Sequence, residues 1–279
     1  MKYTDTQNNR LIELGVPADE LEQEFETTDA RDKKFYSLER KQIKAGKEKL
    51  QRLLRETHVP AALKCRRDLE NWLIDEEDFT QVSTQIIISA DKIEKMNIES
   101  DNHLRDQIFW VGKNKCLRPM HAPNLYEMMR DIHKITNEAV RIFEVGSCFR
   151  KESQGAKHLN EFTMLNLVEL AAGEDGYQVE RLQELAAGAM AAVGIKDYKI
   201  VTESSGVYGT TVDIEYKGIE IASGAYGPHP LDANWGVFDT WVGLGIGVER
   251  LAMALGNHNT IKAVSKNSAY LDGISLKLK

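Results

Sequence analysis

The stretch FRKESQGAKHLNEFTML, residues 149–165, joins two runs of strand composition, AVRIFEVGSCF before it and EFTMLNLVEL at its end. The residues between the runs, 153–157, are small or polar and favour a loop. We therefore predict two antiparallel strands joined by a loop, with an arginine, a glutamate and a histidine close to it. A solvated hairpin and a ligand site would both account for this pattern, and the rest of the chain has to separate them.

The composition is that of a folded, reduced protein. The chain has 279 residues and 42% hydrophobic residues, which suffices for one large domain or for a large and a small one. It contains no apolar run near the ~18 residues of a membrane span, and its N-terminus, MKYTDTQNNR, lacks the apolar core of a signal peptide. Cys65, Cys116 and Cys148 lie far apart and outside zinc-binding spacing. We therefore expect a cytoplasmic protein without a structural metal or a membrane contact.

The net charge of −7 argues against a nucleic-acid partner, but the charge is unevenly distributed. Residues 31–67 carry thirteen Lys and Arg against four Asp and Glu, whereas residues 1–30 carry two against eight. The basic stretch is either a solvated helix with i,i+4 pairs, such as Glu48 with Arg52, or a contact surface for a phosphate backbone. Spaced leucines and Pro60 predict a helical segment at 1–58 and a second domain at 59–279.

The second domain has the pattern of runs of strands separated by a few helices. We predict helices at 61–74, 124–135 and 179–195, strands at 79–88, 139–152 and 161–170, successive strands within 201–227, a hairpin at 106–120, and a strand passing into a helix at 241–256. Consecutive strands favour an α+β fold with an antiparallel sheet over a doubly wound parallel sheet.

The stretch GLGIGVER, residues 243–250, has glycines at every second position. In a strand this spacing leaves one face without side chains, so that a flat ligand or another backbone can approach it closely. A structural bulge is the alternative explanation. Arg150 could clamp a phosphate, Phe162 could offer its ring to a base, and Arg250 could pair or stack from the other side. These parts together predict a nucleotide held over a floor of glycines.

Two segments resemble signature motifs of the class II aminoacyl-tRNA synthetases. Phe149-Arg150-x-Glu152, a loop and His158-x-x-x-Phe162 resemble motif 2, and Gly243-x-Gly245-x-Gly247-x-Glu249-Arg250 resembles motif 3. Further segments, LRPMHAPNLY, VYGTTVDI and AYLDG, are similar to the pyrrolysyl-tRNA synthetases, in particular to the catalytic, C-terminal protein of the bacterial form. The resemblance implies an α+β fold in which the antiparallel β-sheet of class II synthetases is flanked by helices, with an N-terminal helical segment.

The same resemblance implies an activity with ATP and Mg²⁺ as cofactors. The chain would activate pyrrolysine, or a similar bulky lysine derivative, to an aminoacyl-adenylate and transfer it to the cognate tRNA. The first step, in-line attack of a carboxylate on the α-phosphate, needs positioning and charge stabilisation more than a general base. The implied residues are Arg150 and Arg250 for catalysis; Arg150, Glu152, His158, Leu159, Phe162, Glu220, Ile221, Ser223 and Arg250 for ATP; and Glu220 and Ser223, which offer hard oxygens, for the metal.

An apolar pocket for the amino acid is implied in the same way. Its residues are Ala122, Leu125, Tyr126, Met129, Asn166, Val168, Tyr208, Ser223, Ala225, Trp241 and Gly243. Asn166 would hydrogen-bond the side-chain amide of the substrate, and Tyr208 would cap the substrate's ring from a loop. Because Asn166 lies in the apolar strand TMLNLV, we expect it to have a hydrogen-bonding partner, either a ligand or a network.

Three residues depart from the family pattern. Gln85 stands where class II motif 1 has a proline at the dimer interface, although the resemblance still implies a homodimer. His121 stands where the family has an apolar residue, beside the predicted pocket, and Thr240 stands where a proline is usual. A paralogue that adenylates another amino acid or serves another acceptor therefore stays open, as does a catalytically inactive tRNA-binding or regulatory protein on the same scaffold.

The implied macromolecular partner is a pyrrolysine-type tRNA, and a separate N-terminal tRNA-binding protein could assist its binding. Because 29 residues follow Arg250, we expect the tRNA to be recognised through its body and acceptor end rather than by an anticodon-binding domain. We predict that the basic segment contacts phosphates through Arg31, Lys33, Lys34, Arg40, Lys41, Arg52 and Arg55.

Overall fold

The structure is a computed structural model that describes residues 1–279 except 57, 99–101, 152–157, 174, 206 and 279. The described residues fall into two compact units. One holds residues 1–64 and 252–279, and the other holds residues 65–154 and 158–251. The sequence pattern did not predict the association of residues 252–279 with the N-terminal segment, and it placed the boundary after residue 58.

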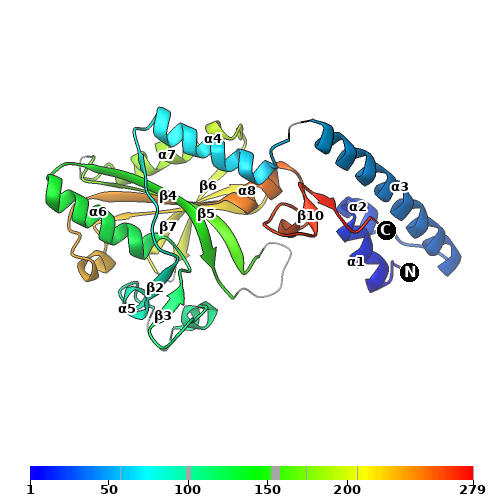
Figure 1. The fold of residues 1–279 in the computed structure, drawn as a ribbon, viewed down its shortest axis with the longest axis horizontal. Coiled ribbons are helices and arrows are strands. Elements are labelled where there is room, and N and C mark those ends of the chain that lie inside the picture. Colours follow the sequence, from blue (N-terminus) through cyan, green and yellow to red (C-terminus); the bar gives the residue numbers. More distant parts are fainter. Residues whose placement is uncertain (57, 99–101, 152–157, 174, 206, 279) are drawn as a thin grey trace. The chain divides into compact units, whose positions relative to one another are not determined.

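A seven-stranded sheet is the centre of the unit formed by residues 65–154 and 158–251, within the part that the structure describes (Figure 1). In spatial order its strands are β1 (Thr80–Gln81), β4 (Val140–Phe149), β5 (Glu161–Leu170), β9 (Trp241–Gly247), β8 (Ile219–Gly227), β7 (Gly209–Tyr216) and β6 (Lys199–Ser205). All neighbours pair antiparallel except the short β1, which runs parallel to β4. The predicted α+β fold with an antiparallel sheet is confirmed.

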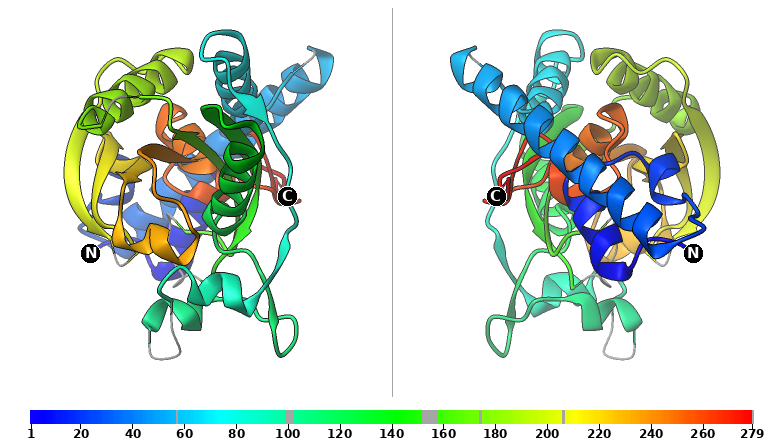
Figure 2. Two further views of the ribbon diagram at one scale, coloured as in Figure 1. Left: turned by 90° about the vertical axis from the view of Figure 1, so that its left-hand side faces the viewer. Right: turned by 90° about the vertical axis from the view of Figure 1, so that its right-hand side faces the viewer.

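Helices cover both faces of this sheet, as two views from different directions show (Figures 1 and 2). α7 (Gln178–Ala192) packs on β8 and β9, where a side chain at Gly224 would meet Leu182 at 2.7 Å. α6 (Ala122–Thr136) packs on β4 and β5. The shorter elements of this unit are α5 (Ala90–Glu94), η1 (His103–Gln107) and η2 (Pro230–Asn234), and α4 (Ala61–Asp75) and α8 (Val248–Leu255) run across its boundaries.

The predicted strand at 79–88 is interrupted. The structure has β1 at its start and β2 (Ile87–Ser89) at its end, and β2 pairs with β3 (Lys115–Leu117). Between them the backbone amide and the hydroxyl of Thr84 donate to the Glu144 carboxylate at 3.1 and 2.6 Å. The Thr84 amide is therefore satisfied by a side chain and not by the backbone of a neighbouring strand. The predicted hairpin at 106–120 forms only in its middle, where Trp110 and Cys116 make an antiparallel bridge flanked by backbone hydrogen bonds from Leu117 to Phe109 and from Val111 to Lys115. On its other side β3 pairs with β2.

The unit of residues 1–64 and 252–279 is helical at its N-terminal end. It contains α1 (Asp5–Glu13), α2 (Ala18–Leu21), α3 (Thr28–Arg55), η3 (Ile261–Ala263) and the short hairpin β10–β11 (Tyr270–Leu271 and Ile274–Ser275). Leu11, Phe35 and Leu38 are buried in its small core, which explains why the amphipathic α3 folds against α1. Gly46 of α3 leaves room for Leu278, since a side chain there would lie 3.1 Å from it.

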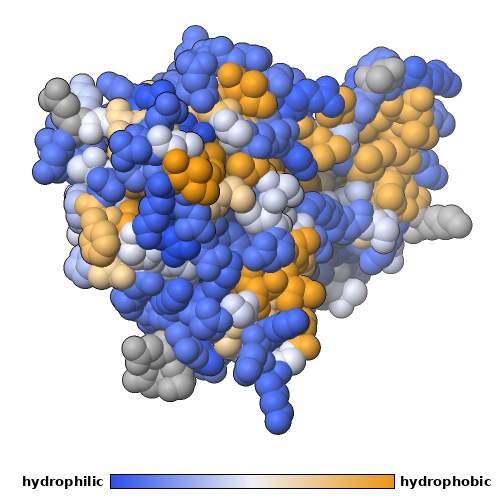
Figure 3. All heavy atoms as spheres, turned by 60° about the vertical axis from the view of Figure 1, so that its left-hand side comes forward, coloured by the Kyte–Doolittle hydropathy of each residue, from blue (hydrophilic) through white to orange (hydrophobic). Residues whose placement is uncertain are grey.

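None of the described helices combines the length and the apolar character needed to cross a membrane. The face drawn in Figure 3 is mostly hydrophilic, with its hydrophobic side chains in separate patches.

Candidate active site

One face of the sheet carries the strand residues that were predicted for both small substrates. Residues opposite each other on neighbouring strands point to the same face, and alternate residues along a strand do so too. Asn166 of β5 lies opposite Gly245 of β9, which lies opposite Ser223 of β8. By this register the face also holds Phe162, Val168, Trp241, Gly243, Gly247 and Ala225.

A β-bulge adds Glu220 to this face. Glu220 and Ser223 are three residues apart, so a regular strand would point them to opposite sides. The register between β7 and β8 shifts by one residue at this point, and Glu220 lies opposite Glu215. Ile221 is the extra residue, and its side chain is 1% exposed. An ATP contact at Ile221 would therefore have to use its backbone.

Arg150 and Phe162, two of the residues predicted to bind the nucleotide, are in contact. Arg150 follows directly after β4, and its Nε donates to the backbone oxygen of Pro119 at 2.9 Å. The carbon of its guanidinium lies 5.3 Å from the centre of the Phe162 ring, which is a cation–π contact. A flat ring bound against Phe162 would therefore have a guanidinium beside it.

The neighbouring loop is only partly covered by the structure. Glu152, predicted to bind the adenine amino group, lies outside the described residues. His158 and Leu159 are partly buried and come shortly before β5. They precede Phe162 by four and three positions in the sequence.

Glu249 and Arg250, which are adjacent in the sequence, have different environments: the first is buried and anchors a helix, and the second is partly exposed at the site. Glu249 is 3% exposed, and its carboxylate accepts hydrogen bonds from the amide and the hydroxyl of Thr163, both at 2.8 Å. It thereby fixes the start of α8 to β5. Arg250, one residue on, is partly exposed and pairs with the Glu220 carboxylate at 3.3 Å. The anchoring role of Glu249 was not predicted.

The predicted metal ligands have a third oxygen-bearing neighbour. The hydroxyl of Ser223 donates to Oδ1 of Asp213 at 2.6 Å, and Asp213 lies opposite Ser223 in the register. Glu220 and Ser223 therefore offer carboxylate and hydroxyl oxygens on one face, a donor set that fits a hard divalent cation shared with phosphate. No cluster of three or more His, Cys, Asp or Glu able to hold a metal occurs in the described part of the chain.

The residues predicted for the amino acid come together in one apolar cluster. Leu125, Tyr126, Met129, Val168, Ala225 and Trp241 are all buried in it, with Ala122 and Tyr208 partly buried beside them. α6 supplies the first three and the sheet the next three, so the cluster fills the space between that helix and the sheet. The predicted pocket residues are therefore neighbours in space, although 119 positions separate Ala122 from Trp241 in the sequence.

A buried carboxylate orders the aromatic residues of this cluster. Asp232 is 2% exposed, and it accepts from the hydroxyl of Tyr126 and from Nε1 of Trp241, both at 2.8 Å. Burial, with Tyr208 and Asp232 close by, raises the pKa of Tyr126 far above its usual value, so Tyr126 stays neutral. Tyr208 packs edge-on against Trp241, with ring centres 6.1 Å apart. No signal in the sequence pointed to Asp232.

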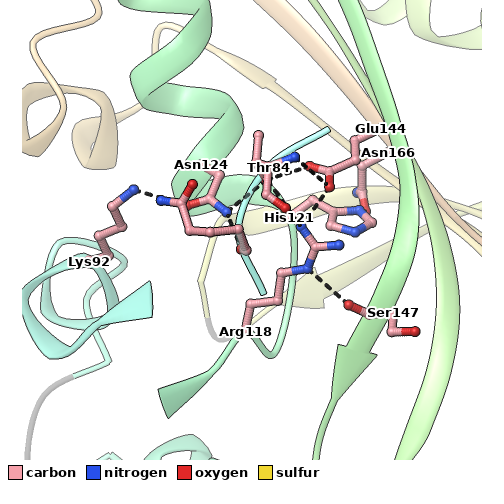
Figure 4. A network of polar contacts seen from close by, with 9 residues as sticks. Thr84, Lys92, Arg118, His121, Asn124, Glu144, Ser147 and Asn166 are labelled. Atoms are coloured by element: carbon pink, nitrogen blue, oxygen red, sulfur yellow. Dashed lines mark hydrogen bonds and ion pairs between the residues drawn. The ribbon is translucent and has the colours of Figure 1, made fainter. Parts of the chain in front are cut away.

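His121 takes part in a buried polar network at the start of α6 (Figure 4). Its side chain is fully buried, and its Nδ1 lies 3.0 Å from Oδ1 of Asn166. The expectation that Asn166 needs a hydrogen-bonding partner is thereby confirmed. Next to His121, Arg118 and Glu144 form an ion pair at 2.6 Å, in which each side chain is 2% exposed.

This burial should make the stability of the protein depend on pH. The pKa of His121 is lowered to about 4, mainly because burial disfavours the imidazolium, and then because the Arg118 cation is near. The unfolded chain has a histidine pKa of about 6.5 and so binds a proton in this window that the folded state does not; stability therefore falls as the pH falls. When the pH is lowered from roughly 7 to 5, we expect the free energy of unfolding to fall by about 2 kcal/mol more in the unchanged protein than in His121→Leu. Urea unfolding at each pH measures this difference.

His258, whose pKa is also lowered by burial, is present in both proteins of this comparison and cancels out. Equal losses in the two proteins would contradict the prediction.

The basic residues of α3 divide into two groups. Three of the predicted tRNA-binding residues have acidic partners: Arg31 with Asp32 at 2.9 Å, Lys33 with Asp29 at 2.7 Å and Lys34 with Glu20 at 3.0 Å. The other four are Arg40, Lys41, Arg52 and Arg55, which are exposed and have no acidic partner among the residues that the structure describes. Lys44 and Lys47 are exposed on the same side as Arg40 by helical spacing, and they were not predicted.

A separate shallow cavity of about 190 Å³ lies where β5, β9 and α7 meet. Of the predicted residues it involves only Trp241. Its carboxylate, Glu169, is 4% exposed and pairs with Arg141 at 3.1 Å and with Arg181 at 3.0 Å. Arg181 also pairs with Glu77 at 2.8 Å, so two carboxylates offset the two cations and the cavity offers little to a charged ligand.

Comparison with known proteins places this geometry in context. Residues 51–272 match the family described as tRNA synthetases class II core domain (F). Two solved structures of pyrrolysyl-tRNA synthetase from Desulfitobacterium hafniense are each 43% identical to the chain; one superposes with a TM-score of 0.92 and covers 100% of this chain and 99% of its own, and the other has a TM-score of 0.90 and covers 99% and 98%.

Two curated relatives match over shorter stretches. An O-phosphoserine–tRNA(Cys) ligase of Methanocorpusculum labreanum is 32% identical over 142 residues, which are 47% of this chain and 26% of that protein. A phenylalanine–tRNA ligase alpha subunit of Mycoplasma genitalium is 27% identical over 86 residues, which are 30% of this chain and 25% of that protein. The chain thus spans about a quarter of the length of these two relatives.

Proposed function

The chain belongs to the family of class II tRNA synthetase core domains, and we propose that it is a tRNA ligase that activates pyrrolysine with ATP and transfers it to tRNA. The observation that carries this proposal is one sheet face that holds Phe162, with the Arg150 guanidinium 5.3 Å from its ring, then the glycines of β9, and then the sheet side of the apolar cluster. The 43% identity with the Desulfitobacterium enzymes over the whole chain supports the choice of amino acid.

ATP would occupy the end of the face around Arg150 and Phe162. Arg150 would bind the α-phosphate and the amino-acid carboxylate and would bring the attacking oxygen and the phosphorus into line. Arg250 would stabilise the negative charge of the outer phosphates once it leaves Glu220. Gly245 and Gly247 have no side chains of their own, which leaves the space above them to Asn166, Met164 and Arg250. Mg²⁺, held by Glu220 and Ser223, would neutralise phosphate charge when bound.

The amino acid would lie with its side chain in the apolar cluster. Val168, Ala225 and Trp241 form its sheet side and Tyr126 and Leu125 its helix side. A pocket of this composition favours a long side chain with a bulky, uncharged end. Asn166 supplies the polar contact at the centre of the face.

The tRNA would bind along the exposed basic residues of α3, here called the basic stripe and defined as Arg40, Lys41, Arg52 and Arg55. We further propose a homodimer in the cytoplasm, assisted by a separate N-terminal tRNA-binding protein. Gln85 stands in place of the motif 1 proline, and the molecular mass of the protein in solution tests the dimer directly.

Reversing the basic stripe should weaken tRNA binding. In the variant with all four residues changed to Glu, we expect the affinity for a pyrrolysine-type tRNA transcript to fall by at least about 10-fold, because each phosphate that is no longer neutralised keeps its counterions. The slope of log affinity against log salt should become flatter, by up to about 0.7–0.9 for each such phosphate. Filter binding over a series of salt concentrations measures both quantities.

The matched comparison reverses two residues in each variant. Lys33→Glu/Lys34→Glu changes cations that are paired with Asp29 and Glu20, and it should weaken binding less than Arg52→Glu/Arg55→Glu. Equal effects of these two variants, or unchanged affinity in the fourfold variant, would remove the basic stripe from the proposal.

ATP–pyrophosphate exchange tests the activity itself. We expect exchange with pyrrolysine and with bulky neutral lysine derivatives, and none above background with the common amino acids. Exchange with only a common amino acid would indicate a paralogue of different specificity. Exchange with no amino acid at all would indicate an inactive tRNA-binding protein on this scaffold.

A further inference from the structure

The fully buried His121 lies against the side chain of Asn166. It stands at the N-terminal end of α6, and its Nδ1 lies 3.0 Å from Oδ1 of Asn166. An imidazole nitrogen next to an amide oxygen forms a hydrogen bond only if the nitrogen carries the proton. The orientation of Asn166 therefore depends on which ring nitrogen of His121 is protonated.

The surroundings of His121 Nε2 decide which ring nitrogen carries the proton. His121 Nε2 is buried and has no hydrogen-bonding partner in the part of the chain that the structure describes. The space above Gly146 is shared by Arg118 and His121: a side chain at Gly146 would clash with the Arg118 guanidinium and would lie 3.4 Å from Nε2. A cation on this side of the ring disfavours a proton there and favours a lone pair. The single proton of the neutral ring therefore belongs on Nδ1.

The Arg118 guanidinium is itself fixed. Its Nε donates to the backbone oxygen of Ser147 at 2.9 Å, and its Nη1 donates to Glu144 at 2.6 Å and to the hydroxyl of Thr84 at 3.1 Å. Figure 4 shows His121 between this network and Asn166. The tautomer of His121 is thus set by a guanidinium that is held by hydrogen bonds within the protein.

A protonated Nδ1 determines how Asn166 presents its amide. Its Oδ1 accepts from His121, so its Nδ2 points away, over the floor of the face: a side chain at Gly245 would lie 2.7 Å from Nδ2. Asn166 itself is only partly buried. It therefore offers N–H donors, and not its oxygen, to whatever lies on the glycine floor.

We propose that His121 is a positioning residue that holds the Asn166 amide with its N–H donors over the glycine floor. The site then selects amino acids whose side chain places a carbonyl oxygen within hydrogen-bonding distance of Asn166 Nδ2. The proposal rests on the function proposed above and specifies the substrate class of the same site. Substrates with a weak acceptor at this position leave the Asn166 donors unpaired and are rejected. Without His121, Asn166 can turn its oxygen or its nitrogen to the substrate, and the preference weakens.

A matched pair of probes tests this directly. Nε-(cyclopentanecarbonyl)-lysine has a carbonyl oxygen, and its thioamide has the same charge and ring but a larger sulfur that accepts hydrogen bonds poorly. The larger size of sulfur is the same for every variant, so the change in the oxygen-to-sulfur ratio between variants carries the test. In ATP–pyrophosphate exchange, we expect the unchanged protein to prefer the oxygen probe by about 10-fold in kcat/KM, the value of one good hydrogen bond. In His121→Leu the preference should fall to about 2-fold or less.

Rescue separates positioning from packing. His121→Gln keeps an N–H donor for the Asn166 oxygen and should restore most of the preference, whereas Asn166→Ala should remove it. Nitrogen-15 spectra of the folded protein should show the proton of His121 on Nδ1. An unchanged oxygen-to-sulfur ratio in a folded His121→Leu, or a proton on Nε2, would overturn the proposal while leaving the proposed function intact. Exchange with neither probe nor pyrrolysine would instead refute the proposed function and this inference with it.

Discussion

Changing Arg150 to Ala should lower amino-acid-dependent ATP–pyrophosphate exchange by about 10³-fold, because one preorganised cation facing the reacting phosphate is worth several kcal/mol in the transition state. Arg150 lies at the open end of β4, next to the Phe162 ring. The fold should survive, since the side chain makes its hydrogen bond to the Pro119 carbonyl at the edge of the site. Initial rates at saturating ATP, with circular dichroism as a check of folding, measure the effect.

Two controls sharpen this experiment. Lys151→Ala removes the adjacent, exposed cation, whose amino group lies 5.8 Å from the Phe109 ring, and should change exchange by less than about 3-fold. Arg150→Lys keeps the charge but loses the planar fork and should recover only a small part of the activity. Near-normal exchange in folded Arg150→Ala would refute the role given to this residue.

Changing Arg118 to Met should destabilise the fold by about 3–5 kcal/mol, which is the usual cost of leaving one charge of a buried ion pair without its partner. Arg118 and Glu144 are each 2% exposed and lie 2.6 Å apart. Thr84 would still donate to Glu144 but carries no compensating charge. Urea unfolding measures the loss as a lower midpoint.

The double variant Arg118→Met/Glu144→Gln tests the cause. An uncharged Gln no longer needs a cation, so the double variant should recover at least about half of the lost stability. A single variant within about 0.5 kcal/mol of the unchanged protein, or a double variant worse than the single, would show that the pair does not hold this part of the fold.

The strands of the site were predictable because their signals are local. Alternation and β-branched residues located β4 and β5, and the spacing of Gly243, Gly245 and Gly247 located the open face of β9. Once the strands pair, register alone brings Asn166, Gly245 and Ser223 together. Register therefore explains why residues that the motifs and the family resemblance singled out lie on one face of the sheet.

The parts that escaped prediction depend on contacts between distant residues. Asp232 orders Tyr126 across 106 positions, and Glu144 interrupts the predicted strand at 79–88 by binding Thr84 across 60. A lone acidic residue in a sequence does not say which side chain it will meet. The same holds for α3, where the charge count could not separate Lys33 and Lys34, which are paired, from the exposed basic stripe.

The bulge at Ile221 is a further case. From sequence spacing, Glu220 and Ser223 point to opposite sides of a strand, and only the shifted register between β7 and β8 brings them to one face. The pairing of these two residues came from the family resemblance, and the structure supplies its geometric reason.

The central claim, that this chain loads pyrrolysine onto tRNA, is tested most directly by aminoacylation. Purified protein, ATP, Mg²⁺ and a pyrrolysine-type tRNA transcript are incubated with pyrrolysine or with a mixture of the twenty common amino acids, and charged tRNA is separated on an acid gel. We expect a shifted, acylated band with pyrrolysine that requires ATP and disappears with Arg150→Ala. Charging by a common amino acid alone, or none with pyrrolysine, would contradict the claim.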